Sequence, residues 1–132
     1  MKFTFDIKSP QQQYIQITAE IKATGKETTV FFPAWRPGRY ELGDFAKNVN
    51  HFQIFNGDGS ALEFQKKNKN TWIVQTEGCS TITIKYSYYA TDLNAGSTFL
   101  DATQLYVNPV NCCLFTDESY NDEITVQLNI PA

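Results

Sequence analysis

The sequence predicts an all-β domain, mainly antiparallel, that folds as a β-sandwich or a curved open sheet. Apolar and polar residues alternate with period two in several separate segments, which is the pattern of strands with one buried face. Aromatic residues make up 14% of the 132 residues, and together with abundant Thr and Ile they favour strands over helices. Turn-forming residues separate the segments at short intervals, as they do in sandwiches and open sheets.

Four segments alternate most clearly, and each is expected to bury its apolar face in the core. Their apolar members are Phe3, Phe5 and Ile7; Ile15, Ile17, Ala19 and Ile21; Ile82, Ile84, Tyr86 and Tyr88; and Ile124, Val126, Leu128 and Ile130. Gly25 marks a turn after the second segment, and a further strand is expected from Thr28 to Phe32.

Turn residues place further strands in the middle of the chain. Asn56-Gly57-Asp58-Gly59 predicts a reversal between the apolar runs Phe52–Phe55 and Leu62–Phe64. The polar stretch Lys66–Asn70 then precedes a strand expected from Thr71 to Thr76. These segments add at least one hairpin to the predicted fold.

Only one stretch of the chain, Tyr40 to Val49, has helical periodicity, so at most one short helix is expected. No internal repeat, low-complexity tract or linker divides the sequence. Residues 1–132 are therefore expected to form one β domain.

Composition excludes several classes of function. Hydrophobic residues make up 42% of the chain, enough to build a core, and charged residues make up only 19%, which argues against disorder. The net charge is -3, and Lys and Arg are scattered, so nucleic acid is not an expected partner. No apolar run is long enough to cross a bilayer, and KFTFDIK at the start has no signal-peptide core. The compartment, cytoplasm or periplasm, stays open.

The chain does not offer the ligands of a catalytic metal centre. A hydrolytic zinc site needs several ligands and a base that activates water, whereas His51 is the only histidine and no HExxH sequence occurs. His51 is instead expected to be exposed at the start of a strand. The cysteines Cys79, Cys112 and Cys113 are odd in number and lack activating neighbours, so they are expected to be buried free thiols. No cofactor and no catalytic residue are expected in this chain.

The segment Phe32 to Tyr40 is expected to be a stiff loop. Its sequence FPAWRPGRY contains two prolines, which fix backbone angles and remove hydrogen-bond donors, and Pro37-Gly38 favours a tight turn. The rings of Trp35 and Tyr40 then have two interpretations. They fill the edge of the core, which the general burial of aromatic residues favours, or they form a rigid platform for a partner or ligand.

This loop and the residues after it resemble a known family. FPAWRPGRYELGDFAKNV is similar to the proline-glycine signature in the N-terminal domain of the glycyl aminopeptidases, family sixty-one of the metallopeptidases. The similarity continues through Trp72, Tyr86–Ala90 and Leu100–Thr103 to Tyr106–Asn108 and Leu114–Phe115. The sequence departs from the family pattern at Gly43, Lys47 and Pro109, which puts in doubt any contact that the usual Arg makes at position 43.

The resemblance implies the role of a non-catalytic domain in a larger enzyme. In that family an N-terminal β domain precedes a gluzincin domain, where a HExxH helix and a later Glu bind zinc, and a PDZ domain. The zinc ligands would follow Ala132, and the catalytic domain of the same polypeptide would be the partner, with peptide substrate contacted at most indirectly. The residues that the resemblance assigns to the motif or to an inter-domain surface bordering the substrate cleft are Pro33, Trp35, Pro37, Gly38, Tyr40, Asp44, Phe45, Asn48, Asp101 and Asn108.

Two alternatives remain open at this stage. Trp35, Tyr40 and Trp72 would form an aromatic platform if the domain binds carbohydrate or another small ligand. The domain would instead pair through an exposed sheet edge if it serves only protein interaction. An excised domain is also expected to expose an apolar patch where its partner was, and to self-associate through it.

Overall fold

The computed structural model describes residues 1–7, 13–32, 49–68, 70–90, 99–100, 105–106, 113–114, 116 and 124–129. The strands are β1 (Lys2–Asp6), β2 (Tyr14–Lys22), β3 (Glu27–Phe31), β4 (Val49–Asn56), β5 (Phe64–Asn68), β6 (Thr71–Gln75), β7 (Thr81–Tyr89), β8 (Phe99–Leu100), β9 (Leu105–Tyr106) and β10 (Thr125–Asn129). These residues contain no helix, and all strand pairs are antiparallel except β1 with β10. The all-β, mainly antiparallel prediction is confirmed. Of the stretch proposed for a short helix, only Val49 is described, and it begins β4.

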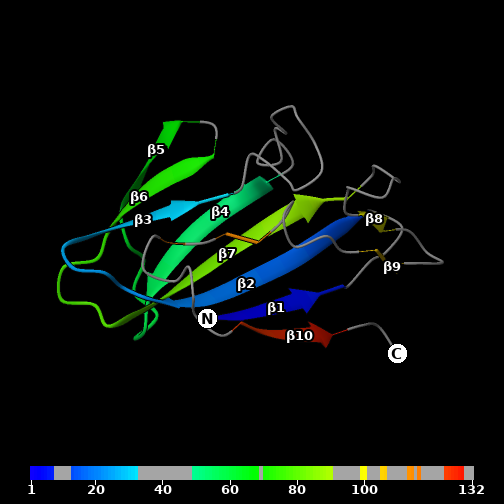
Figure 1. Ribbon diagram of the computed structural model, residues 1–132, viewed down its shortest axis with the longest axis horizontal. Coiled ribbons are helices and arrows are strands. Elements are labelled where there is room, and N and C mark those ends of the chain that lie inside the picture. Colours follow the sequence, from blue (N-terminus) through cyan, green and yellow to red (C-terminus); the bar gives the residue numbers. More distant parts are fainter. Residues whose placement is uncertain are drawn as a thin grey trace.

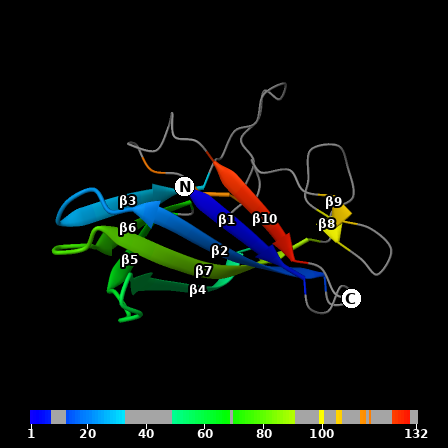
Figure 2. The same ribbon diagram turned by 90° about the horizontal axis from the view of Figure 1, so that it is seen from below.

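The strands form two larger sheets and one short ribbon. A five-stranded sheet has the order β10-β1-β2-β7-β4, a three-stranded sheet has the order β3-β6-β5, and β8 pairs with β9. The smaller sheet lies at one end of the larger sheet in both views of the ribbon (Figures 1 and 2). The last described strand, β10, lies beside the first, β1.

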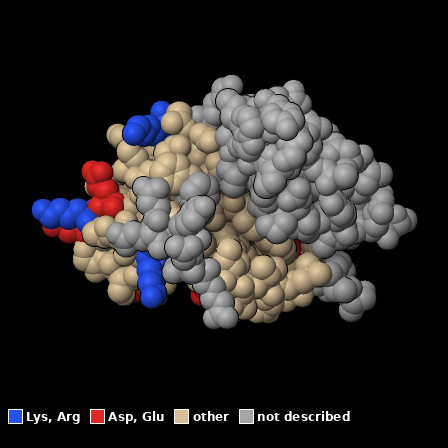
Figure 3. Space-filling model, viewed as in Figure 1, with Lys and Arg blue, Asp and Glu red and all other residues tan. Residues whose placement is uncertain are grey.

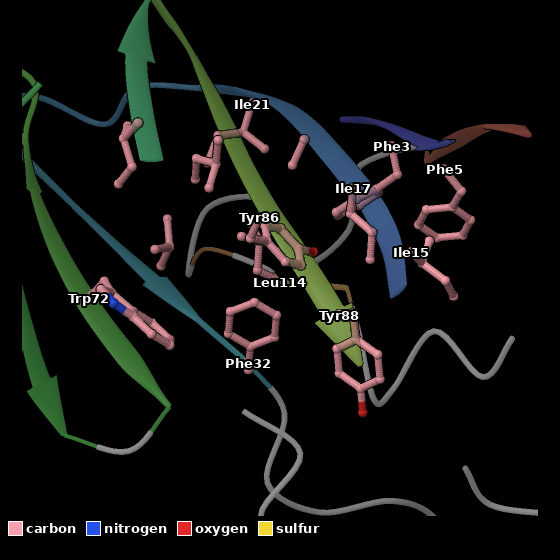
Figure 4. Close-up of a cluster of buried hydrophobic side chains, with 14 of the residues drawn as sticks. Phe3, Phe5, Ile15, Ile17, Ile21, Phe32, Trp72, Tyr86, Tyr88 and Leu114 are labelled. Carbon is pink, nitrogen blue, oxygen red and sulfur yellow. The ribbon is translucent and has the colours of Figure 1, made fainter. Parts of the chain in front are cut away.

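Side chains of both larger sheets contribute to one core. The predicted inward residues of β1, β2 and β7, from Phe3 to Tyr88, are all at most 5% exposed. Val30, Trp72 and Val74 of the smaller sheet join the same cluster. Figure 4 shows Phe32 and Trp72 on the side of Tyr86 that faces this smaller sheet. The alternation in the sequence therefore predicted these core residues correctly.

A buried chain of hydroxyl groups ties the corner between β2 and β3 to the end of β6. Thr28 and Thr76 are fully buried, and their Oγ1 atoms lie 2.9 Å apart. Thr76 Oγ1 donates to the carbonyl oxygen of Gly25 at 2.8 Å, and the backbone N–H of Thr24 donates to Thr28 Oγ1 at 3.0 Å. Because the proton of Thr76 is directed to Gly25, the hydroxyl of Thr28 donates to that of Thr76.

The predicted reversal at Asn56–Gly59 is confirmed. The N–H of Asn56 donates to the carbonyl of Ser60, and the N–H of Gly59 donates to that of Asn56. Gly59 has φ +90, a conformation that glycine adopts without strain. The N–H of Ser60 donates to Asp58 Oδ1 at 2.9 Å, and this hydrogen bond lowers the pKa of Asp58.

The polar stretch before β6 is itself largely strand. Lys66, Lys67 and Asn68 belong to β5, where the sequence alone gave no strand signal because the alternation is missing. Phe64 begins this strand opposite Val74, and the remaining residues are exposed. Since β5 is an edge of the smaller sheet, charged residues fit a position where unpaired backbone groups would otherwise invite aggregation.

Strand β4 contains a bulge, which allows apolar residues at an odd spacing to point to the same face of the sheet. Val49 and Phe52 are three residues apart, so a regular strand would place them on opposite faces. The pairing with β7 shifts between Asn50 and Gln53, and His51 adopts φ +55 at that shift. The extra residue lets Val49, Phe52 and Ile54 all contact the core, while His51 is exposed as the sequence predicted.

The backbone at His51 gives the first testable prediction. We expect His51→Val to lower the free energy of unfolding by about 1–2 kcal/mol, because a β-branched residue is disfavoured in the left-handed region. His51→Gly should leave this free energy unchanged or raise it. Denaturant unfolding measures both variants. The matched control is Gln53→Val on the same strand, and an equal loss at both positions would contradict a special backbone requirement at His51.

Candidate functional site

The residues that the resemblance assigns to the family motif lie outside the described part of the chain. These are Pro33, Trp35, Pro37, Gly38, Tyr40, Asp44, Phe45, Asn48, Asp101 and Asn108. Their roles remain predictions. The residues that flank the segment 33–48 are described. Phe32 is hydrogen-bonded to Asn70 through both its N–H, at 2.8 Å, and its carbonyl, at 3.1 Å, and Val49 pairs with Tyr88.

The segment 33–48 thus starts and ends at defined places in the fold. It begins after β3 in the smaller sheet and ends at β4 in the larger one. The ring of Phe32 is 1% exposed and contacts Trp72 and Tyr86 edge-on, with centroid distances of 5.4 and 5.3 Å. Phe32 and Val49, the residues that flank the motif segment, therefore both contact the core.

Trp72 belongs to the core, which corrects the aromatic-platform alternative. Its side chain is 5% exposed and stacks on Phe52 with a centroid distance of 4.6 Å and an angle of 18° between the rings. Phe64 contacts Phe52 from another side at 5.3 Å, and Lys66 Nζ lies 5.2 Å from the centre of the Trp72 ring. A buried indole offers no face to a sugar. Of the three proposed platform residues, Trp35 and Tyr40 are not described.

The cysteines are less buried than the sequence suggested. Cys79 has a free thiol and is half-buried, and Cys113 is half-buried as well. Both pack against the core cluster from its periphery. Cys112 lies outside the described residues. Among the residues that the structure describes, no group of three or more His, Cys, Asp or Glu side chains gathers to hold a metal ion.

A polar depression of about 500 Å³ lies on the outer face of the five-stranded sheet. Its lining residues come from four strands: Asp6, Tyr14, Gln16, Ile17, Thr18, His51, Gln53, Lys85, Tyr86 and Ser87. Ser87 Oγ donates to Gln16 Oε1 at 2.8 Å, and Lys85 Nζ lies 5.6 Å from the ring centre of Phe55. The hydroxyl of Ser87 thus donates to an amide oxygen, which is not a base that activates a nucleophile.

Positive and negative charges are mixed on the face of the described residues shown in Figure 3. The Lys side chains there lie apart from one another, with Asp and Glu side chains nearby, and form no single basic area. Lys2 Nζ and Glu20 Oε2 form an exposed pair at 4.0 Å. Within the described residues, no helix is long and apolar enough to cross a membrane.

Strand β10 has an exposed apolar face, which corrects the prediction of a fourth buried segment. Ile124 is 56% exposed, Val126 52% and Leu128 50%, and Ile130 lies outside the described residues. In the register with β1, Val126 is opposite Phe3 and Leu128 is opposite Phe5. Partners in register point to the same side of a sheet. The three side chains, called the β10 stripe below, therefore lie on the inner face, beyond the edge of the covered core.

Comparisons with known proteins agree with the sequence resemblance. A family model described as "Peptidase M61 N-terminal domain" matches residues 2–132. The fold is similar to that in a crystal structure of an aminopeptidase N family protein from Idiomarina loihiensis, with a TM-score of 0.91 and 24% sequence identity. The match covers 98% of the present chain and 22% of that chain, so the present chain spans about a fifth of the length of its neighbour. No curated protein matches the sequence.

Proposed function

Since the chain belongs to the M61 peptidase family as an N-terminal domain, we propose that it is the non-catalytic part of a zinc-dependent glycyl aminopeptidase. In this proposal the domain packs on the catalytic domain of the same polypeptide, and the motif segment 33–48 borders the substrate cleft. The supporting observation is the family match over residues 2–132. The fold match, with a TM-score of 0.91, covers about a fifth of the solved aminopeptidase N family protein. This supports the proposal that the present chain is one domain of a longer peptidase.

The residues that the structure describes do not form a catalytic zinc site. Such a site takes three protein ligands and an open position for water. The sequence holds one histidine, His51, and it stands on the exposed face of a bulge rather than in an enclosed site. Cys79 follows β6, on a different part of the fold. In this proposal the zinc belongs to the catalytic domain of the same polypeptide.

The residues on either side of the motif segment support a role for it in contacts with the neighbouring domain. The flanking residues are held in the fold, Phe32 by two hydrogen bonds to Asn70 and Val49 by its pairing with Tyr88 in the five-stranded sheet. Loops positioned by a rigid scaffold are the usual place for contacts with substrates and neighbouring domains. Trp35 and Tyr40 are the large side chains in this segment that would make such contacts.

The proposal is tested with two proteins, the 132-residue chain and the longer polypeptide from the same gene. We expect only the longer polypeptide to release glycine from a glycyl anilide, and a zinc chelator should abolish this activity. Trp35→Ala in the longer polypeptide should lower kcat/KM for this substrate. Zinc-dependent cleavage by the highly purified 132-residue chain would refute the division of labour, and an unchanged kcat/KM for Trp35→Ala would refute a contribution of that ring to the cleft.

A further inference from the structure

We propose that the β10 stripe (Ile124, Val126 and Leu128) is the surface on which the next domain of the same polypeptide packs. The inference rests on the proposed function, because that function supplies the second domain. It adds a second part of the interface, separate in sequence from the motif segment 33–48 and not assigned by the comparisons. The contact surface would lie on the inner face of the five-stranded sheet, at its β10 edge.

The side chains of β10 are sorted onto two chemically different faces. The side chains on the polar face form hydrogen bonds. Gln127 Nε2 donates to Asn129 Oδ1 at 3.1 Å, and Asn129 Nδ2 donates to Asp6 Oδ1 on β1 at 2.7 Å. The backbone is hydrogen-bonded to the β1 region at both ends, through Thr125 N–H to Met1 and Ile7 N–H to Asn129. The apolar side therefore faces inward in a fixed register, and a rotation of the strand would break these bonds.

The side chains of the β10 stripe are far more exposed to solvent than the inward-facing side chains of the neighbouring strand β1. Phe3 and Phe5 on β1 are 0% and 4% exposed, whereas their partners Val126 and Leu128 are 52% and 50% exposed. The inner face thus changes from covered to open within one strand spacing. Exposed apolar residues in a row, rather than scattered singly, mark interaction surfaces.

Strand β10 also lacks the features that protect other edges of these sheets. The edge strand β5 carries Lys66 and Lys67, and the edge strand β4 has a bulge at His51. Residues 124–129 (ITVQLN) contain no charged residue, no proline and no bulge. Free edges usually carry such protection, and the centres of protein interfaces are depleted in charge. The composition of β10 is that of a covered strand.

The occupant follows from the order of the domains. In the family, the region matched by residues 2–132 is N-terminal, so the remainder of the polypeptide follows β10, the described strand nearest to residue 132. Consecutive elements of a chain are usually neighbours in space. In the solved neighbour, 78% of the chain lies outside the match (100 minus 22). An apolar surface at the point where the chain enters the next domain is suited to contact that domain.

The test compares thiol labelling at two adjacent positions of β10. Val126→Cys places a thiol in the stripe, and Gln127→Cys places one on the opposite face as a matched control. Each variant is made in the 132-residue chain and in the longer polypeptide, and alkylation by iodoacetamide is followed by peptide mass spectrometry, which separates the new thiols from the native cysteines. In the longer polypeptide, we expect labelling at position 126 to be slower on the order of tenfold or more, since a docked surface opens rarely. Labelling at position 127 should be similar in both proteins.

Two results would overturn the inference. Equal labelling at position 126 in both proteins would show that the stripe stays open in the longer polypeptide. Protection at position 126 in the longer polypeptide that is lost on dilution would assign the stripe to a second copy instead. Failure of the interface can be distinguished from failure of the proposed function, because glycyl anilide cleavage is measured separately. Protection of the thiol at position 126 without glycyl anilide cleavage would refute only the enzymatic proposal. Cleavage without protection of that thiol would refute only the proposed interface.

Discussion

Replacing Trp72 by alanine should lower the free energy of unfolding by about 3–5 kcal/mol, the usual cost of removing a large buried aromatic side chain. The indole is 5% exposed and contacts Phe32 and Phe52 at 5.4 and 4.6 Å between ring centres. Its removal leaves a cavity where the smaller sheet meets the larger one, and it ends ring contacts that contribute beyond their area. Denaturant unfolding followed by far-ultraviolet circular dichroism measures the loss.

The matched control for this variant is Tyr89→Ala. Tyr89 also takes part in a ring contact, at 4.9 Å from Tyr14, but it is 38% exposed. We expect a markedly smaller loss for this variant, because less apolar surface leaves the core. Similar losses for the two variants would contradict the central position of Trp72. They would also reopen the possibility that its ring faces a ligand.

Replacing Thr76 by valine should destabilise the domain by about 1–3 kcal/mol, the cost of leaving buried polar groups without partners. The change keeps the shape of the side chain but removes the hydroxyl that donates to Gly25 and accepts from Thr28. Thr28 and Thr76 are both 0% exposed, so water does not replace the lost bonds without rearrangement. The same unfolding measurement applies.

A double-mutant cycle provides the control for the hydroxyl chain. Thr28→Val combined with Thr76→Val removes both hydroxyls, so the combined loss should be smaller than the sum of the single losses. Thr83→Val, on the half-buried outer face of β7, should change the unfolding free energy little. Additive losses at Thr28 and Thr76 would mean that the two hydroxyls are not energetically coupled.

The sequence predicted the strands that alternate regularly, because in them the period of side chains and the burial pattern agree. This holds for β1, β2 and β7, whose inward residues are all buried. The bulge at His51 was missed, although the odd spacing between Val49 and Phe52 contains its signal. The polar part of β5 was missed because an edge strand with exposed residues has no alternation to detect.

The prediction for β10 was correct for the strand and wrong for its burial. Alternation specifies which side chains share a face, and the stripe does share the inner face with Phe3 and Phe5. It does not specify whether another part of the molecule covers that face. The motif residues came from resemblance alone, since no physical pattern in FPAWRPGRY distinguishes a core plug from a contact surface. The described structure places only the ends of that segment.

The pairing of β1 with β10 has a consequence for biosynthesis. Lys2 is the register partner of Thr125, so residues more than a hundred positions apart in sequence are neighbours in the sheet. Contacts of such long range slow folding, because much of the chain must be ordered before they form. During translation, Phe3 and Phe5 would border an incomplete sheet edge until the last strand leaves the ribosome. The domain is therefore expected to complete its folding only after β10 has been synthesised.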